Sequence, residues 1–108
     1  MTWTTIRDRV ELALPNVTLS GVLSYNPAHA SLIIADHETG EAEVLCVDLT
    51  VYGYVAAPGE VFVKGWSEHS GLATALEVAG VARIVETVIV GPFDSPAHRM
   101  RLLAARAD

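Results

Sequence analysis

The 108-residue sequence contains a single cysteine, Cys46, so it cannot form an internal disulfide framework. It also lacks an uncharged apolar run near the roughly 20 residues that a membrane-spanning helix needs. Charged residues interrupt the most apolar stretches at Asp48, Glu60, Lys64 and Glu77. The opening segment, MTWTTIRDRVEL, carries charges where a signal peptide would have its apolar core. These absences predict a cytoplasmic protein with no membrane partner.

Positive charge is scarce through most of the chain. Residues 10–82 contain nine carboxylates and one cation, Lys64, and the whole chain has a formal net charge of −6. Nucleic-acid-binding proteins usually carry a clustered basic patch, because neutralising phosphates drives their affinity. A phosphate backbone would repel most of this chain. The charge distribution therefore argues against direct nucleic-acid binding.

The sequence also lacks the spacings of common cofactor and metal sites. It has no glycine-rich phosphate loop and no zinc-ribbon or metalloprotease motif. One acidic cluster stands out and comprises Asp36, His37, Glu38, Glu41 and Glu43. It does not follow the twelve-residue pattern of a calcium loop. We therefore expect no metal and no cofactor, and we interpret the cluster as a solvated hairpin tip or a partner-binding acidic face.

His69 lies beside Glu68 and near two serines, Ser67 and Ser70. A catalytic pair needs a hydroxyl within hydrogen-bond reach of the imidazole and a third group to orient it. Adjacent residues on a turn rarely face one another in this way, so the group predicts a helix-capping turn. Cys46 has no neighbouring cation in the sequence to lower its pKa, which favours a buried structural thiol. We expect no catalytic residues and a non-enzymatic protein.

Alternating apolar and polar residues predict strands, and Gly, Pro and Asn mark the turns between them. The expected strands are 17–25, 31–35, 43–49, 61–64 and 83–90, with a hairpin loop at 36–41 and a longer loop at 51–60. A helix is expected at about 70–79, because residues 72, 76 and 79 form one apolar stripe. Ser67 and Ser70 are candidates to cap its start. Gly80 fits the position that ends it.

Two segments stay open between helix and strand. Residues 3, 6, 10 and 14 have near-helical spacing, whereas 10, 12 and 14 alternate as in a strand. Residues 98–104 fit a last strand or a short helix. Pro92 and Pro96 argue against a central strand at their positions. The chain as a whole predicts one α+β domain over residues 1–108, with a mostly antiparallel sheet of about five or six strands and one main helix packed on one face.

The chain is more apolar than a small soluble domain needs. Hydrophobic residues make up 51% of the sequence, while aromatic residues make up only 6%. One small core has limited room for so many apolar side chains, and a large exposed apolar patch usually marks an interface. This excess predicts a homodimer or a face that binds another protein.

Two groups of residues are candidates for protein binding. The first is the acidic cluster, through Asp36, Glu38, Glu41 and Glu43. The second is an aromatic region, because Tyr52 and Tyr54 lie in the 51–60 loop and Trp66 lies on the turn before the helix, next to Glu68. Exposed tryptophan and tyrosine often anchor a partner. Packing of Trp66 against the core beside the helix is the alternative.

Three stretches carry a resemblance: ASLIIADHETGEAEVLCVDL, GEVFVKGWSEHSGLATALEVAGVAR and VGPFDSPAHRMRL. Together they resemble a family of small uncharacterised proteins from bacteria, phages and plasmids. The shared pattern is Lys-aromatic-Ser-Glu, then Gly-Leu, Ala-Leu and Ala-Gly. It is carried here by Lys64, Trp66, Ser67, Glu68, Gly71, Leu72, Ala75, Leu76, Ala79 and Gly80. His69 departs from the expected Asn. The resemblance implies a setting in mobile elements, where many small acidic proteins inhibit host defence.

These observations predict a small acidic module that acts by protein–protein contact. Its sharpest form is an inhibitor encoded by a phage or mobile element, anti-CRISPR-like or antirestriction-like, whose partner is a basic nucleic-acid-binding complex. Two alternatives stay open. One is a self-associating structural module. The other is a small-ligand-binding domain that uses the aromatic region at 52–66.

Overall fold

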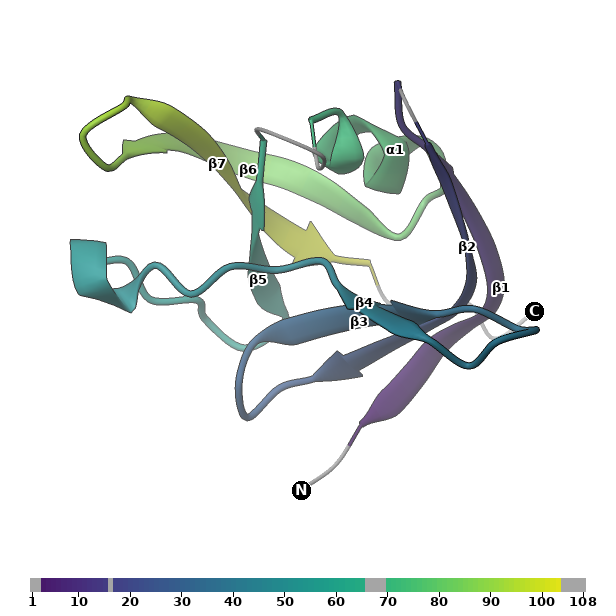
Figure 1. The fold of residues 1–108 in the computed structure, drawn as a ribbon. Coiled ribbons are helices and arrows are strands. Elements are labelled where there is room, and N and C mark those ends of the chain that lie inside the picture. The colour runs from purple at the N-terminus through teal and green to yellow at the C-terminus, as the bar shows by residue number, and fades with distance from the viewer. Residues whose placement is uncertain (1–2, 16, 66–69, 104–108) are drawn as a thin grey trace.

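The protein folds into two antiparallel sheets and one α-helix in the computed structural model, which describes residues 3–15, 17–65 and 70–103 (Figure 1). The first sheet contains β1 (Thr4–Ala13), β2 (Thr18–Asn26), β3 (Ser31–Ala35) and β4 (Ala42–Val44). The second contains β5 (Glu60–Lys64), β6 (Ala82–Val90) and β7 (Ser95–Leu102). A 3-10 turn, η1 (Thr50–Tyr52), precedes β5, and helix α1 (Leu72–Val78) lies between β5 and β6. The predicted α+β class is confirmed.

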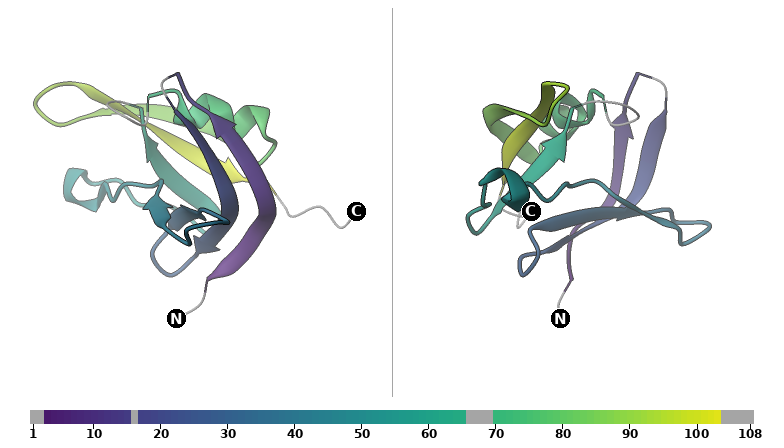
Figure 2. Two further views of the ribbon diagram at one scale, coloured as in Figure 1. Left: turned by 45° about the vertical axis from the view of Figure 1, so that its right-hand side comes forward. Right: turned by 60° about the vertical axis from the view of Figure 1, so that its left-hand side comes forward.

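The first sheet is a meander in the order β1-β2-β3-β4. Val10 and Leu12 of β1 are buried, while their neighbours Glu11 and Ala13 are exposed. The segment that was open between helix and strand is therefore a strand over Thr4–Ala13, because pairing with β2 buries one of its faces. Figure 2 shows β1 and β2 curving together around the rest of the molecule.

The second sheet has the order β5-β7-β6, so the last strand of the chain is the central one. The open segment at 98–104 is therefore a strand as far as Leu102. The expectation that proline would stay out of a central strand is wrong for Pro96, which lies within β7. Strand β5 pairs only with residues 97–101 of β7, so Pro96 lies just beyond its end. There its carbonyl still accepts a hydrogen bond from the Gly65 N–H at 2.9 Å.

A single segment carries the chain from one sheet to the other. The expected strand at 43–49 is shorter in the structure, because β4 ends at Val44. The Leu45 N–H donates to the Leu32 carbonyl of the first sheet at 2.8 Å. Two residues later, the Val47 N–H donates to the Phe62 carbonyl of the second sheet at 2.9 Å. The alternation at 43–49 therefore spans a segment whose backbone hydrogen bonds go to two different sheets.

The main apolar core lies between the sheets and is closed at one end by α1. It contains fully buried residues of the first sheet (Leu12, Leu23, Leu32), of the second sheet (Val61, Val63, Met100) and of the helix (Leu72, Leu76). A second apolar cluster covers the other face of the second sheet and contains Leu49, Phe62, Val88, Val90 and Ala97. The second sheet is therefore packed on both faces.

Helix α1 begins slightly later than predicted. Its N-cap residue is Gly71, which makes no side-chain capping hydrogen bond, so Ser70 does not cap it. Ser67 lies outside the described residues. The predicted stop is confirmed, because Gly80 has a positive φ of 73°. The Gly80 N–H donates to the Glu77 carbonyl and the Val81 N–H donates to the Leu76 carbonyl, both at 3.0 Å. This pair of hydrogen bonds is typical of a helix that ends at a glycine.

Gly21 allows β2 and β3 to approach closely. Its φ is +151°, and a Cβ built on it would lie 1.9 Å from the Ala35 carbonyl oxygen. A side chain there would collide with backbone that cannot move without breaking the sheet. Gly40, in the hairpin at 36–41, has a φ of +75° and no heavy atom within 4 Å of such a Cβ.

We expect Gly21→Ala to lower the free energy of unfolding by about 2–4 kcal/mol, because strain adds to the forced separation of β2 and β3. Gly40→Ala is the matched control and should cost about 1 kcal/mol through its backbone conformation alone. Urea unfolding of the two variants measures both losses. Equal losses would show that β2 and β3 do not need this close contact.

Candidate functional site

The acidic cluster lies on the hairpin that joins β3 and β4. We call Asp36, Glu38, Glu41 and Glu43 the acidic tip. Asp36, Glu38 and Glu41 are exposed, and Glu43 is half-buried. The Asp36 N–H donates to the Glu41 carbonyl at 2.8 Å, and the Gly40 N–H donates back to the Asp36 carbonyl at 2.9 Å. The predicted hairpin turn is thereby confirmed.

The Asp36 carboxylate orders the turn as well as charging it. Its Oδ1 accepts hydrogen bonds from the Thr39 N–H at 3.0 Å and the Glu38 N–H at 2.7 Å. These bonds, that from Thr39 foremost, hold the pKa of Asp36 below its ordinary value. Asp36 therefore stays charged at neutral pH, and its hydrogen bonds hold the backbone of the turn in place.

A shallow hollow of about 270 Å³ lies beside the acidic tip. It is lined by the start of β2 (Thr18, Leu19, Ser20) and by Ile34, Asp36, Thr39, Glu41, Ala42 and Glu43. Within the described residues, no three His, Cys, Asp or Glu side chains converge to hold a metal ion. The arrangement suits the capture of a basic side chain from a partner, because carboxylates and hydroxyls share one rim.

The aromatic region is divided by the structure. Tyr52 lies in η1 and is 49% exposed. Its hydroxyl faces Gly91, in the turn between β6 and β7. Tyr54 is partly buried and packs edge-on against Phe62, with ring centroids 6.2 Å apart. It belongs to the second apolar cluster. Trp66 and Glu68 lie outside the described residues.

The two candidate regions do not form one surface. The acidic tip projects at one end of the molecule, and η1 projects at the other (Figures 1 and 2). A flat partner of ordinary size would contact one end or the other. Both groups were predicted from the sequence as binding residues, and no sequence pattern indicated that they would lie so far apart.

An open groove of about 530 Å³ runs between the turn at 27–31 and the segment at 44–56. Its walls include His29, Cys46, Asp48, Thr50 and Tyr54. Small-molecule sites usually measure about 300–1,000 Å³ and combine apolar walls with a few polar groups. A small ligand of the predicted alternative would fit here, against Tyr54 and Phe62 of the 52–66 region.

Cys46 lies in this groove but is poorly suited to reaction. The residue is partly exposed, yet its thiol is surrounded by protein atoms, and burial raises its pKa to about 12. The thiolate is the nucleophilic form, so its population at neutral pH is very small. The expectation of a structural cysteine agrees with this environment.

Alkylation of Cys46 by iodoacetamide near pH 8 should be on the order of 100- to 1,000-fold slower in the folded protein than in urea, because the pKa shift depletes the thiolate. Mass spectrometry of the alkylated fraction over time gives both rates. The urea-unfolded chain at the same pH is the control. Rates within tenfold of each other would contradict the burial of the thiol.

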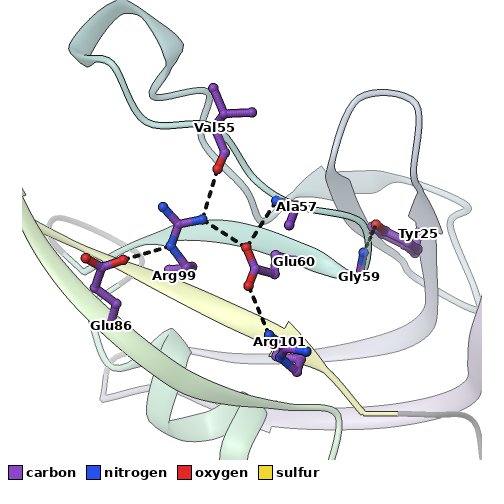
Figure 3. Close-up of polar contacts among 8 residues, drawn as sticks. All are labelled: Tyr25, Val55, Ala57, Gly59, Glu60, Glu86, Arg99 and Arg101. Carbon is purple, nitrogen blue, oxygen red and sulfur yellow. Dashed lines mark hydrogen bonds and ion pairs between the residues drawn. The ribbon is translucent and has the colours of Figure 1, made fainter.

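A polar cluster around Arg99 lies on the outer face of the second sheet (Figure 3). The Arg99 guanidinium donates to Glu60 through Nη1 at 2.9 Å and to Glu86 through Nε at 2.8 Å. The same Nη1 donates to the Val55 carbonyl at 2.9 Å. The guanidinium carbon also lies 4.7 Å from the centre of the Phe62 ring. Arg101 contacts the other oxygen of Glu60 at 3.4 Å.

This cluster fastens the 55–57 segment to the second sheet. Glu60 Oε1 accepts the Ala57 N–H at 3.1 Å, and only 8% of the Glu60 side chain is exposed. The Ala57 hydrogen bond and then Arg99 lower the pKa of Glu60. Glu86 and then Glu60 raise the pKa of Arg99. Arg99 and Arg101 alternate along β7, and both pair with Glu60 of the neighbouring strand β5.

Glu60→Gln should lower the free energy of unfolding near pH 7 by about 1–3 kcal/mol, because it removes a charge-assisted contact from a buried position. The folded pKa of Glu60 lies below its ordinary value of 4.5. Its ionised form therefore stabilises the fold above that pH, and the contribution is lost as pH falls through the folded pKa. The gap between wild type and variant should close in acid.

Urea unfolding at a series of pH values measures this gap. Glu38→Gln, on the exposed acidic tip, is the matched control and should leave the curve unchanged. A gap for Glu60→Gln that stays constant into acid would show that the ion pair does not contribute through its charge.

Comparison of the chain with protein-family models, with curated proteins and with solved structures found no match. Within residues 3–15, 17–65 and 70–103, no helix is long and apolar enough to cross a membrane.

Proposed function

We propose that this protein is a small, non-enzymatic module that binds a basic protein surface through its acidic tip. The observation that carries the proposal is the concentration of four carboxylates, Asp36, Glu38, Glu41 and Glu43, on one projecting hairpin. The backbone of this hairpin is held by Asp36 itself. An ordered group of like charges loses little entropy on binding, so it suits fast and specific capture.

The partner that fits this surface best is a protein whose basic groove normally holds nucleic acid. Such grooves carry clustered Lys and Arg side chains, and an acidic protein can compete for them by charge complementarity. The resemblance to small phage and plasmid proteins supports the sharper form of the proposal. In that form the module works in the cytoplasm and inhibits a host defence complex, in an anti-CRISPR-like or antirestriction-like manner, by occupying its groove.

The test is capture of partners from nuclease-treated host lysate by the tagged protein, at low and high salt, with identification by mass spectrometry. The binding variant is Asp36→Asn, Glu38→Gln, Glu41→Gln, which removes three charges. Its new Asn side chain keeps an oxygen to accept the turn bonds. The matched control is Asp8→Asn, Glu11→Gln, Asp94→Asn, which changes the net charge equally at exposed positions elsewhere.

We expect a stoichiometric basic partner whose capture weakens as salt rises. The tip variant should bind it at least about tenfold more weakly, whereas the control variant should stay within about threefold, because the tip would make the direct contacts. Equal losses in the two variants would contradict a specific role for the acidic tip. Capture that does not depend on salt would contradict an electrostatic mode of binding.

A capture experiment that recovers only the protein itself would move attention to the two alternatives. The groove beside Tyr54 is the place to look for a small ligand. Self-association would instead be sought along the exposed edges of the sheets.

A further inference from the structure

Strand β6 forms one edge of the second sheet. It pairs with β7 along its whole length, from Ala82 opposite Leu102 to Val90 opposite Ser95. No strand among the described residues lies on its other side. Edge strands expose unpaired backbone N–H and C=O groups and readily pair with another strand, so proteins usually protect them.

The proline in β7 shows which backbone groups of β6 point outward. The Pro96 carbonyl points toward β5, because it accepts the Gly65 N–H. In an antiparallel pair of strands, two residues that lie opposite each other either bond to each other or both direct their N–H and C=O groups away from the other strand. Ile89 lies opposite Pro96, so its backbone groups point out from the edge. The backbone groups of Thr87 also point outward, because alternate residues of a strand share a direction, while those of Val88 bond to β7.

The first half of this edge is not available for pairing with another strand. The ladder has an irregularity between Ile84 and Glu86, which displaces Val85. The Ile84 N–H donates to the Glu77 carboxylate of α1 at 2.8 Å. At the other end, the chain turns away at Gly91, where φ is +77°. The open stretch is therefore short and runs from Glu86 to Val90.

The open stretch has none of the usual protections. It reads Glu-Thr-Val-Ile-Val, with no lysine and no proline. Ile89 is 55% exposed, a large fraction for an isoleucine within a strand. Its single charge, Glu86, is paired with Arg99 on the sheet face. A β-branched edge whose one charge is engaged on the sheet face favours strand pairing over solvation.

We propose that β6 pairs antiparallel with β6 of a second copy of this chain, so that the two second sheets join across a two-fold axis. Only a register centred on Val88 pairs the two outward-facing residues with each other. Thr87 would lie opposite Ile89 of the partner subunit, and Val88 would lie opposite Val88 of the partner subunit, on the axis. In this register the N–H and C=O groups of Thr87 and Ile89 satisfy one another in both copies.

Charge and symmetry support a second copy as the occupant. In this register Glu86 lies opposite Val90 of the partner subunit, so no like charges face each other across the axis. A register centred on Glu86 would oppose two carboxylates and is disfavoured. A two-fold axis lets a strand supply its own complement, and two-fold dimers are the most common closed assembly.

Analytical ultracentrifugation over a range of protein concentrations tests the dimer. We expect a mass of two chains that falls to one on dilution. Ile89→Pro removes an N–H that the β6–β7 ladder does not use, so the fold should survive while dimer dissociation rises at least about tenfold. Ile89→Ala keeps the backbone donor and should weaken the dimer less. Val78→Lys, on an exposed position of α1, should leave it unchanged.

Disulfide trapping tests the register in a Cys46→Ser background. Under mild oxidation, Val88→Cys should form a covalent dimer, because the two copies of residue 88 face each other on the axis at disulfide distance. Thr87→Cys should not, because it lies opposite residue 89. Circular dichroism of each variant checks that it remains folded.

A single-chain mass at every concentration up to about millimolar would overturn the proposal, as would a dimer that Ile89→Pro leaves intact. Equal cross-linking of Val88→Cys and Thr87→Cys would overturn the register. Salt separates this proposal from the acidic-tip proposal. Screening should strengthen a dimer of two chains that each carry a net charge of −6, whereas it should weaken capture of a basic partner.

Discussion

The fold depends on one layer of apolar contact between two curved antiparallel sheets. Leu12, Leu23 and Leu32 of the first sheet meet Val61, Val63 and Met100 of the second, and all are fully buried. Neither sheet could stand alone, because a sheet with one apolar face must cover that face to be stable in water. The short helix α1 closes one end of this layer through Leu72 and Leu76. The segment at 44–56 bonds to both sheets and covers the outer face of the second.

The Arg99 cluster completes this arrangement on the outer face. A guanidinium packed on Phe62 and bonded to Glu60, Glu86 and the Val55 carbonyl joins three stretches of chain. Because the second sheet is packed on both faces by these contacts, its free edge is the part left for pairing. The polar cluster thus has a structural role, and the two proposed interaction surfaces lie elsewhere.

Those surfaces differ in chemistry and in position. The acidic tip is a hairpin of the first sheet, whereas the open stretch of β6 is an edge of the second. The acidic tip presents carboxylates, whose attraction for a cationic group would weaken with salt, and the β6 edge presents backbone groups and apolar side chains. A dimer through β6 would leave the acidic tip of each copy out of the strand pairing. The two proposed interactions therefore need not compete.

Local patterns accounted for much of the secondary structure. The alternation in 17–25, 31–35, 61–64 and 83–90, the glycine at Gly40 and the stop at Gly80 each have a short-range cause in the backbone. The same reasoning failed where a segment's partners were distant. The strand expected at 43–49 changes sheets after Val44, and Pro96 sits in a central strand because β5 ends before it.

The α+β class, the acidic hairpin and helix α1 follow from periodicity, charge and turn residues, which are local properties of the sequence. Contacts between distant parts of the chain explain the rest: the strand at Thr4–Ala13, the pairing of Arg99 with Glu60 and Glu86, and the separation of the acidic tip from η1. The physical reason is that strand order and long-range pairing are set by how two sheets share one core. No local pattern encodes that choice.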